Sequence, residues 1–309
     1  MQRGQRRRRI AVTGATGFVG RRVIQHLVAA RHQVVPLSRR TGVDLASSDP
    51  ATLRAALAGI DSVVHCAGIN REIGTQTYDA LHVRGTQALV EAARAAGAGH
   101  ISVLSFLRAR PDGPTAYHRT KWAAEAIIRD SGIPFTVLKA GVIHGRGDHM
   151  LDHLSHALYT FPVFGLVGMQ DQPVRPVAVE DVARILVAAA TGDERLRNRT
   201  ITVLGPEELL LGDAVRRVGR VIGRRPRYVR LPIVGHLVLA RLCEAVMRVP
   251  LVSVAQVHIL AEGIVEAAPP AEEPPPDLVP TTPFSDEVIR AGLPEAGRFG
   301  CRDLRWCRA

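Results

Sequence analysis

The sequence predicts an α/β protein with a doubly wound parallel sheet and a small C-terminal lobe. Over the first 190 residues, short apolar runs alternate with segments of helical periodicity, which is the pattern of repeated β-α-β units. Three glycines follow the first apolar run and open the first helical segment. The chain has 309 residues, of which 46% are hydrophobic and 22% are charged, so it can bury a full core.

The strands of the sheet are expected at residues 10–13, 33–37, 62–66, 100–104 and 135–139, separated by helices at residues 19–30, 50–58, 78–96 and 115–129. A further strand is expected to end near Asp44. Right-handed crossovers place the C-terminal ends of parallel strands on one edge of the sheet, where ligands bind. The candidate binding residues are therefore those that follow the strands.

The second half of the sequence has a different pattern. We expect a helix at 182–190, a strand at 201–204, helices at 211–222 and 234–247 joined by a basic turn at 223–227, and a weak helix at 286–291. Residues 267–283 are acidic and rich in proline, which predicts an extended strap. These shifts divide the chain into an α/β domain at 1–190, a small substrate lobe at 191–266, and a strap with a C-terminal tail at 267–309.

The glycine triplet has the context of a dinucleotide-binding loop, because it lies between a strand and a helix. Such loops use glycine for the tight turn, for close approach of a pyrophosphate, and for packing of the helix on the strand. The N-terminus of the helix supplies free N–H groups and a partial positive charge to the phosphates. The sequence therefore predicts a Rossmann-type domain, with cofactor contacts from Gly14, Thr16, Gly17, Phe18, Val19 and Gly20.

The end of the second expected strand favours NADP(H) over NAD(H). NAD-binding proteins usually place a carboxylate there to hold the ribose hydroxyls, whereas this chain has Arg39 and Arg40. Two guanidinium groups would pair with a 2′-phosphate through charge-assisted hydrogen bonds. We also expect Asp44 and Leu45 to meet the adenine edge.

Tyr117 and Lys121 lie one turn apart on an expected helix, so they share one face. A nearby ammonium favours the phenolate, and we therefore expect Lys121 to lower the pKa of Tyr117 toward the range of an acid–base catalyst. The same lysine can hold the nicotinamide ribose. Ser105, at the end of the preceding strand, can polarise a substrate carbonyl. The alternative is a surface tyrosine that packs over the aliphatic stem of the lysine.

With the glycine loop, Ser105, Tyr117 and Lys121 in this order, the chain resembles the short-chain dehydrogenase/reductase superfamily. Further matches to its extended and atypical branches lie at residues 63–68, 83–86, 141–148 and 176–183. The resemblance is greatest to the atypical group that includes the NAD(P)H-binding accessory subunit of respiratory complex I and its bacterial relatives. It covers roughly residues 9–260.

The resemblance implies a Rossmann core, a small C-terminal lobe over the nicotinamide, and the roles given above for the serine, tyrosine and lysine. It also implies cofactor contacts from Ala67, Gly68, His82, Ala140 and Gly141. The family often has asparagine where this chain has His82, whose ring could hydrogen-bond in place of the amide. The family's serine doublet and its Arg-Pro-Gly segment are replaced here by Leu104-Ser105 and Lys139-Ala140-Gly141.

The formal net charge of +11 permits an anionic partner. No nucleic-acid recognition motif accompanies the charge and aromatics make up only 4%, so we expect a small-molecule substrate and no nucleic acid. A basic run at 216–230 precedes an apolar segment at 231–242, a pair that would suit an anionic membrane surface. We favour instead a solvated helix face followed by a core helix.

The cysteines and histidines have no metal-ligand spacing, which predicts reduced thiols and no metal site. The sequence has neither an apolar signal region nor a run long enough to span a bilayer. We therefore expect a cytoplasmic protein, with peripheral contact at the inner face of a membrane as the alternative. The sequence leaves the substrate and the oligomeric state open.

Three functions fit these observations. We favour an NADP-dependent oxidoreductase acting on a carbonyl or alcohol, with Tyr117 as proton donor, Lys121 orienting the ribose and Ser105 binding the oxygen. The second is a non-catalytic NADPH-binding sensor or assembly protein, in which the Tyr–Lys pair only clamps the ribose. The third is a nucleotide-sugar epimerase or dehydratase. Such enzymes more often retain NAD, and the two arginines after the second strand argue against that.

Overall fold

The computed structural model describes residues 6–47 and 49–306. The chain divides into two compact units, and each unit is built from three separate segments. The first unit contains the residues up to Ala140, Val179–Val203 and Glu266–Pro280. The second contains Gly141–Ala178, Leu204–Val265 and the residues from Thr281 onward. The division therefore differs from the three consecutive regions expected from the sequence, because the chain leaves the first unit after Ala140 and returns to it twice.

The first unit holds a parallel sheet of six strands, which confirms the predicted α/β class. The strand order is β10-β5-β4-β3-β1-β2, with β1 at Arg9–Thr13, β2 at Gln33–Leu37, β3 at Ser62–His65, β4 at Ile101–Phe106, β5 at Phe135–Ala140 and β10 at Arg199–Val203. The chain runs from β1 to β2 on one side and then crosses back to β3 on the other. Ligands of such sheets bind at this switch point, beyond the C-terminal ends of the central strands.

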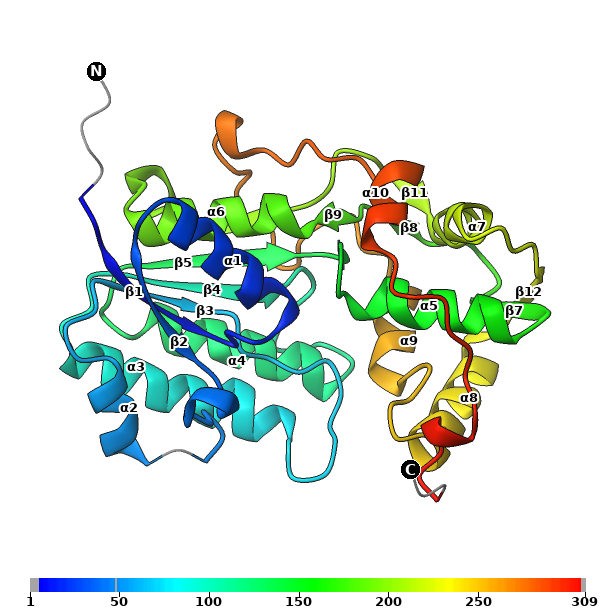
Figure 1. Cartoon of the computed structure of the whole chain (residues 1–309), viewed down its shortest axis with the longest axis horizontal. Coiled ribbons are helices and arrows are strands. Elements are labelled where there is room, and N and C mark those ends of the chain that lie inside the picture. Colours follow the sequence, from blue (N-terminus) through cyan, green and yellow to red (C-terminus); the bar gives the residue numbers. More distant parts are fainter. Residues whose placement is uncertain (1–5, 48, 307–309) are drawn as a thin grey trace. The chain divides into compact units, whose positions relative to one another are not determined.

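Helices cover both faces of this sheet (Figure 1). One face carries α1 (Phe18–Ala29) and α6 (Val179–Thr191), and the other carries α2 (Pro50–Ala56), α3 (Gly85–Ala95) and α4 (Ala116–Arg129). Glu180 at the start of α6 joins it to α1 through Arg22 at 3.2 Å and His26 at 2.9 Å. Apolar side chains of the strands and of α2 and α3 fill the core beneath the second face, among them Leu53, Leu57, Leu89, Ile101 and Val137.

One expectation for the first unit is wrong, and one expected helix is present but differs in its first part. No strand ends near Asp44, because a capping box between Ser38 and Thr41 and the left-handed Gly42 turn the chain at η1 (Arg39–Thr41). The strand at residues 62–65 is therefore the third and not the fourth. The single helix expected at 78–96 is a π-helical turn, η2 (Asp79–Arg84), that continues into α3.

The proline-rich strap lies along the edge of the sheet in the first unit. The N–H group of Thr202 donates to the Glu272 carbonyl at 2.7 Å, and the N–H group of Glu272 donates to the Thr200 carbonyl at 2.9 Å. The N–H group of Ala268 donates to the Leu107 carbonyl at 3.0 Å. The strap thus covers β10, the edge strand, whose peptide groups would otherwise be open to pairing. Short 3-10 turns are η3 (Glu194–Leu196) and η4 (Pro276–Leu278).

The second unit contains helices and short two-stranded ladders. Its helices are α5 (His149–Thr160), α7 (Leu211–Val221), α8 (Ile233–Val246), α9 (Val254–Ala261) and α10 (Asp286–Gly292), and η5 spans Cys301–Asp303. The ladders pair β7 (Val163–Val167) with β12 (Arg227–Leu231), β8 (Pro173–Val174) with β11 (Leu209–Leu210), and β6 (Ile143–His144) with β9 (Val177–Ala178). The basic turn expected to join two helices leads instead into β12.

None of the helices in the described ranges, 6–47 and 49–306, is both long and apolar enough to cross a membrane.

Candidate active site

The glycine loop after β1 leaves no space for side chains. Gly14 has φ +64°, and a Cβ atom there would lie 2.8 Å from the backbone of Cys66 and Ala67. A Cβ atom on Gly20 would overlap the carbonyl oxygen of Gly14, and the Gly17 N–H group donates to that same oxygen at 2.8 Å. The three glycines are thus required by the close packing of the loop on the end of β3 and on the start of α1.

The first turn of α1 is suited to bind phosphate. Gly17 is its N-cap, and no side chain caps the helix. The first N–H groups of the helix therefore keep their capacity to donate to an anion. Thr16 is exposed beside them and Phe18 is half-buried, whereas Val19 is buried and packs in the interior.

The two arginines predicted to select the cofactor follow β2 beside this loop. The N–H group of Ala15 donates to the carbonyl of Leu37, which holds the loop to the end of β2. Arg39 and Arg40 come next in η1, and both are exposed. No hydrogen bond or ion pair joins either guanidinium group to another residue that the structure describes. Both groups are therefore available to an anionic ligand.

The two residues expected at the adenine have structural contacts of their own. Asp44 is half-buried, and its carboxylate accepts from the Ala46 N–H group at 3.1 Å. Leu45 is buried in the core, and a Cβ atom on Gly85 would lie 3.0 Å from its carbonyl oxygen. The Leu45 side chain thus packs inward, and only its backbone could meet a ligand.

Lys121 lies at the C-terminal end of β4, next to the loop that follows β3. Its Nζ donates to the carbonyl of Leu104 at 2.7 Å. A Cβ atom on Gly68 would lie 3.7 Å from this Nζ and 3.5 Å from His82 Nε2. The structure thus brings together Gly68, His82 and Lys121, which span more than fifty residues of the sequence. Ala67, beside them, donates its N–H group to Thr13 Oγ1 at 3.2 Å.

Tyr117 lies one turn before the lysine, in a cluster of aromatic rings. Its ring centroid is 5.4 Å from that of Phe106, 5.7 Å from that of Tyr78 and 5.9 Å from that of His82. Burial raises the pKa of Tyr117 to about 12. The expectation that Lys121 lowers this pKa is wrong for the protein alone, because desolvation of the phenolate dominates. The phenol is therefore protonated at neutral pH, which is the form that can donate a proton.

Burial also affects the titration of the lysine. It lowers the pKa of Lys121 to about 8, against the opposing attraction of the Glu125 carboxylate one turn further along α4. The sequence prediction did not include Glu125. Its spacing of four residues from Lys121 was the available signal, since residues four apart share a helix face.

His82 is held as a neutral ring between two elements. Its Nε2 accepts from the N–H group of Ile69 at 3.1 Å, which places the proton on Nδ1, 3.0 Å from Thr120 Oγ1. Burial lowers the pKa of His82 to about 2. These hydrogen bonds occupy both ring nitrogens, so His82 connects the loop after β3 to α4. It does not offer the nitrogens to a cofactor.

Ser105 differs most from its expected role. Its hydroxyl donates to Glu125 Oε1 at 2.5 Å, and both residues are buried. The same carboxylate contacts Arg129 at 2.6 Å and Lys139 at 3.3 Å. Successive side chains on a strand point to opposite faces, and Phe106 is the neighbour that meets the ring of Tyr117. The structure therefore does not support a substrate-oxygen contact from Ser105.

Ala140 and Gly141, which were expected to contact the cofactor, lie at the end of β5, where the chain passes from the first unit to the second. Ala140 is the last residue of β5 and is buried, and its carbonyl accepts from the N–H group of Leu107 at 2.8 Å. Gly141 is half-buried and begins the second unit.

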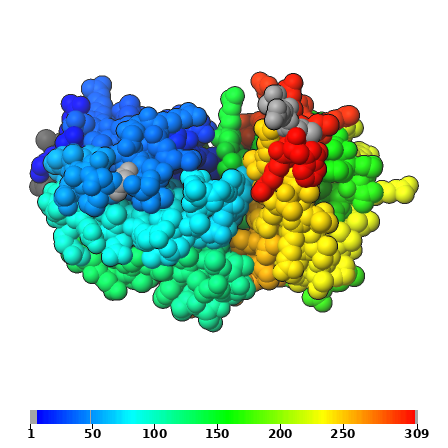
Figure 2. All heavy atoms as spheres, turned by 90° about the horizontal axis from the view of Figure 1, so that it is seen from below, coloured from blue at the N-terminus to red at the C-terminus, as the bar shows by residue number. Residues whose placement is uncertain are grey.

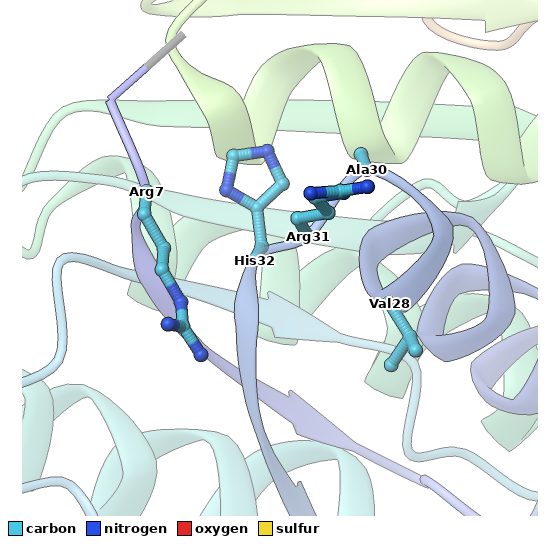
Figure 3. Close-up of a pocket in the computed structure, with 5 residues that line it drawn as sticks. All are labelled: Arg7, Val28, Ala30, Arg31 and His32. Atoms are coloured by element: carbon cyan, nitrogen blue, oxygen red, sulfur yellow. The ribbon is translucent and has the colours of Figure 1, made fainter.

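A hollow of about 650 Å³ lies near the N-terminal ends of β1 and β2. Figure 3 shows its lining, made by Arg7, Val28, Ala30, Arg31 and His32. These residues precede β1 and β2, whereas the glycine loop follows β1. The hollow therefore does not belong to the candidate active site.

Comparisons with known proteins agree with this geometry. A model of the NAD dependent epimerase/dehydratase family matches residues 10–205. The chain is 31% identical over 256 residues to a protein of Caulobacter vibrioides named ceramide reductase, covering 76% of this chain and 77% of that one. It is 31% identical over 235 residues to the (4-alkanoyl-5-oxo-2,5-dihydrofuran-3-yl)methyl phosphate reductase of Streptomyces griseus, covering 72% and 77%. The predicted complex I group is also represented, by the NADH dehydrogenase [ubiquinone] 1 alpha subcomplex subunit 9 of Arabidopsis thaliana. That match is 27% identical over 241 residues and covers 72% of this chain and 60% of the relative.

Solved structures share the fold. The structure of gox2253 has a TM-score of 0.64 at 22% identity and covers 92% of this chain and 96% of its own. A UDP-glucuronic acid 4-epimerase from Bacillus cereus in complex with NAD has a TM-score of 0.61 at 20% identity, covering 72% and 87%. The chain therefore belongs to the NAD-dependent epimerase/dehydratase family of the extended short-chain dehydrogenase/reductase superfamily, and it is an NAD(P)-dependent oxidoreductase.

Proposed function

We propose that this protein is an NADP(H)-dependent reductase that converts a carbonyl group to an alcohol. The observation that carries the proposal is the protonated phenol of Tyr117, one helical turn from an ammonium group at the C-terminal end of β4. Reduction needs an acid that gives up a proton, whereas oxidation of an alcohol needs a base. The names of the two relatives at 31% identity, both reductases, support this direction.

The residues of the first unit fit a dinucleotide. The packed glycine loop lets a pyrophosphate approach the backbone, and the uncapped N-terminus of α1 offers it N–H groups. Arg39 and Arg40 would hold a 2′-phosphate, and no carboxylate follows β2 directly to hold a free 2′-hydroxyl. The preference for NADP(H) therefore rests on the charge of this one turn.

The reaction needs a hydride and a proton, and NADPH would supply the hydride to the carbonyl carbon. Tyr117 would donate the phenolic proton to the carbonyl oxygen as negative charge develops there. Lys121, beside Gly68 and His82, would hold the ribose hydroxyls and stabilise the phenolate left on Tyr117. Ser105 would act indirectly, by fixing the Glu125 carboxylate that attracts the lysine.

Calorimetric titration tests the cofactor first, on protein shown to be free of retained nucleotide. We expect NADPH to bind more tightly than NADH, and Arg39→Ala with Arg40→Ala to remove that preference. A hydrogen bond to a charged group contributes about 1.5 kcal/mol or more, so each arginine should account for at least about tenfold. Arg54→Ala, an exposed arginine on α2, is the matched control. Equal affinity for NADH and NADPH would contradict the cofactor assignment.

Turnover tests the reaction separately. A panel of carbonyl compounds should consume NADPH with the wild-type protein, and Tyr117→Phe should abolish consumption while leaving NADPH binding in place. Unchanged consumption by Tyr117→Phe would exclude this residue as the proton donor.

A further inference from the structure

The second unit exposes an apolar helix face that we expected to be buried. Val234, Val238 and Leu242 lie at successive four-residue spacings on α8, and their exposed fractions are 71%, 53% and 56%. Ile233 and Leu239 flank them and are about two-fifths exposed. We call these five residues the α8 face. Three large aliphatic side chains in one line, from residue 234 to residue 242, form an apolar strip about 12 Å long.

The helix has its core contacts on its other side. His236, Ala240 and Cys243 are buried, and Ala240 belongs to a small core with Val167 of β7 and Val257 of α9. The expected core helix is therefore present and packs through this side, but the α8 face is not a core surface. In Figure 2 the yellow region that contains α8 lies at the surface of its unit.

Further exposed apolar side chains lie near both ends of α8. At the start of the helix, Met169 is exposed and its carbonyl accepts from Arg230 at 2.8 Å, close to the point where β12 leads into α8. At the far end, the N–H group of Arg305 donates to the Val246 carbonyl at 2.9 Å, which brings the C-terminal segment against α8. The next residue, Trp306, is 64% exposed. The red C-terminal segment beside α8 is visible in Figure 2.

The segment that contains α8 is rich in arginine. Residues 216–248 contain nine arginines and a single acid, Glu244, whose carboxylate accepts from the Val254 N–H group at 3.0 Å. Four of the nine are paired with acids elsewhere in the chain, namely Arg216, Arg217, Arg220 and Arg230. Arg225 and Arg227, on the strand side, and Arg241, on α8 itself, are exposed. No hydrogen bond or ion pair joins these three side chains to other residues in the described part of the chain. A partner with apolar groups and negative charge would therefore complement the α8 face and these arginines.

We propose that the α8 face docks on the surface of an anionic lipid bilayer. An aliphatic strip and an exposed arginine on one helix, with an exposed tryptophan in the chain segment that contacts the end of that helix, have the composition of a surface that lies in the interface of a membrane. The strip would enter the boundary between headgroups and acyl chains, and the three arginines would meet the lipid phosphates. A second copy of the chain suits this face poorly, because a symmetric contact would bring Arg241 of each copy against like charge.

Co-sedimentation of the full chain with lipid vesicles tests the proposal. We expect binding to vesicles of phosphatidylcholine mixed with phosphatidylglycerol, little binding to phosphatidylcholine alone, and weaker binding as salt rises. Val238→Asp with Leu242→Asp should weaken binding by about tenfold or more for each residue, because the apolar insertion is lost. Val28→Asp, at an exposed valine of α1 in the other unit, is the matched control.

The arginines and the tryptophan give independent readouts. Replacing Arg225, Arg227 and Arg241 with alanine should weaken binding by about fivefold for each residue, whereas Arg54→Ala should leave it unchanged. The fluorescence of Trp306 should shift to the blue on anionic vesicles, and Trp306→Phe identifies its signal because Trp122 is the other tryptophan.

Three outcomes would overturn the proposal. The wild-type protein remains in the supernatant with anionic vesicles at low salt, or the double variant Val238→Asp, Leu242→Asp binds them as well as the wild type does. In the third, sedimentation velocity shows self-association of the wild type that the same double variant lacks, and the occupant of the face is then a second copy.

Discussion

Replacing the buried Glu125 by glutamine should lower the pKa of Lys121 still further. Glu125 is fully buried on α4, one turn after the lysine, and its carboxylate also contacts Arg129 and Lys139. Burial already lowers the pKa of Lys121 to about 8 because it disfavours the ammonium, and the Glu125 carboxylate works against that effect. Glutamine keeps the size of the side chain and removes its negative charge.

The size of the effect follows from the helix spacing. Residues four apart on a helix have Cβ atoms about 6 Å apart. If the ammonium and the carboxylate are about as far apart as these Cβ atoms, an effective dielectric constant of about 20 gives an attraction of about 3 kcal/mol, which corresponds to about two pH units in the titration midpoint of the lysine. Lys121 would then be mostly neutral at pH 7 and would lose its hold on ribose hydroxyls and on a phenolate.

Nuclear magnetic resonance of labelled lysine side chains measures this directly. The chain has only two lysines, Lys121 and Lys139, so a pH titration gives two sets of signals, and Lys121→Arg assigns them. Glu91→Gln, at an exposed glutamate of α3, is the control for loss of one negative charge. Glu125→Asp should retain most of the wild-type midpoint because it retains the charge.

The reasoning is refuted if the Lys121 midpoint in Glu125→Gln equals that of the wild type. Stability must be measured alongside, since breaking a buried ion pair costs about 3–5 kcal/mol and leaves Lys139 without its carboxylate. A folded variant with a lowered midpoint would give Glu125 a positioning role that acts through the lysine.

Two further predictions concern the loop and the buried histidines. Gly14→Ala should abolish measurable NADPH binding in calorimetry, because its Cβ would overlap backbone, whereas Gly132→Ala, with φ +74° and open space, should cost about 1 kcal/mol of unfolding free energy and preserve binding. If both variants bind normally, the packing argument is wrong. Burial lowers the pKa of His65 to about 3, of His82 to about 2 and of His100 to about 4, from 6.5. Below about pH 6.5 the unfolded chain binds protons that the folded chain does not. Stability should therefore fall by about 1.4 kcal/mol per pH unit for each histidine as pH falls toward 4. Denaturant titrations should show a slope against pH that is smaller by about 1.4 kcal/mol per pH unit in His100→Gln, and an unchanged slope would argue against its burial as the cause.

The sequence predicted features whose determinants lie close together in the chain. The glycine loop, the first strand and α1 follow from one stretch of about twenty residues, and the structure has them in that order. The Tyr–Lys pair needed only the helical repeat. The strand expected at Asp44 failed because Ser38, Thr41 and Gly42 form a local turn that overrides the βαβ pattern.

The direction of individual side chains was not predictable in the same way. Ser105 and Phe106 are adjacent, and only the pairing of β4 with β5 and the packing of α4 decide that the serine meets Glu125 and the phenylalanine meets Tyr117. The pKa of Tyr117 likewise depends on the balance between a nearby cation and the loss of water. That balance requires the positions of all the surrounding rings.

A Rossmann-type domain with a dinucleotide loop, a basic turn after β2 and a Tyr–Lys pair could be predicted from the sequence, because each depends on residues a few positions apart. The packing of the fold was needed to establish that Gly68, His82 and Lys121 meet, that Glu125 is buried, and that the apolar side of α8 faces outward. The physical reason is that burial is a property of the whole fold. An apolar helix segment has the same sequence pattern whether its strip faces a core or the solvent, and only the elements packed around it make the difference.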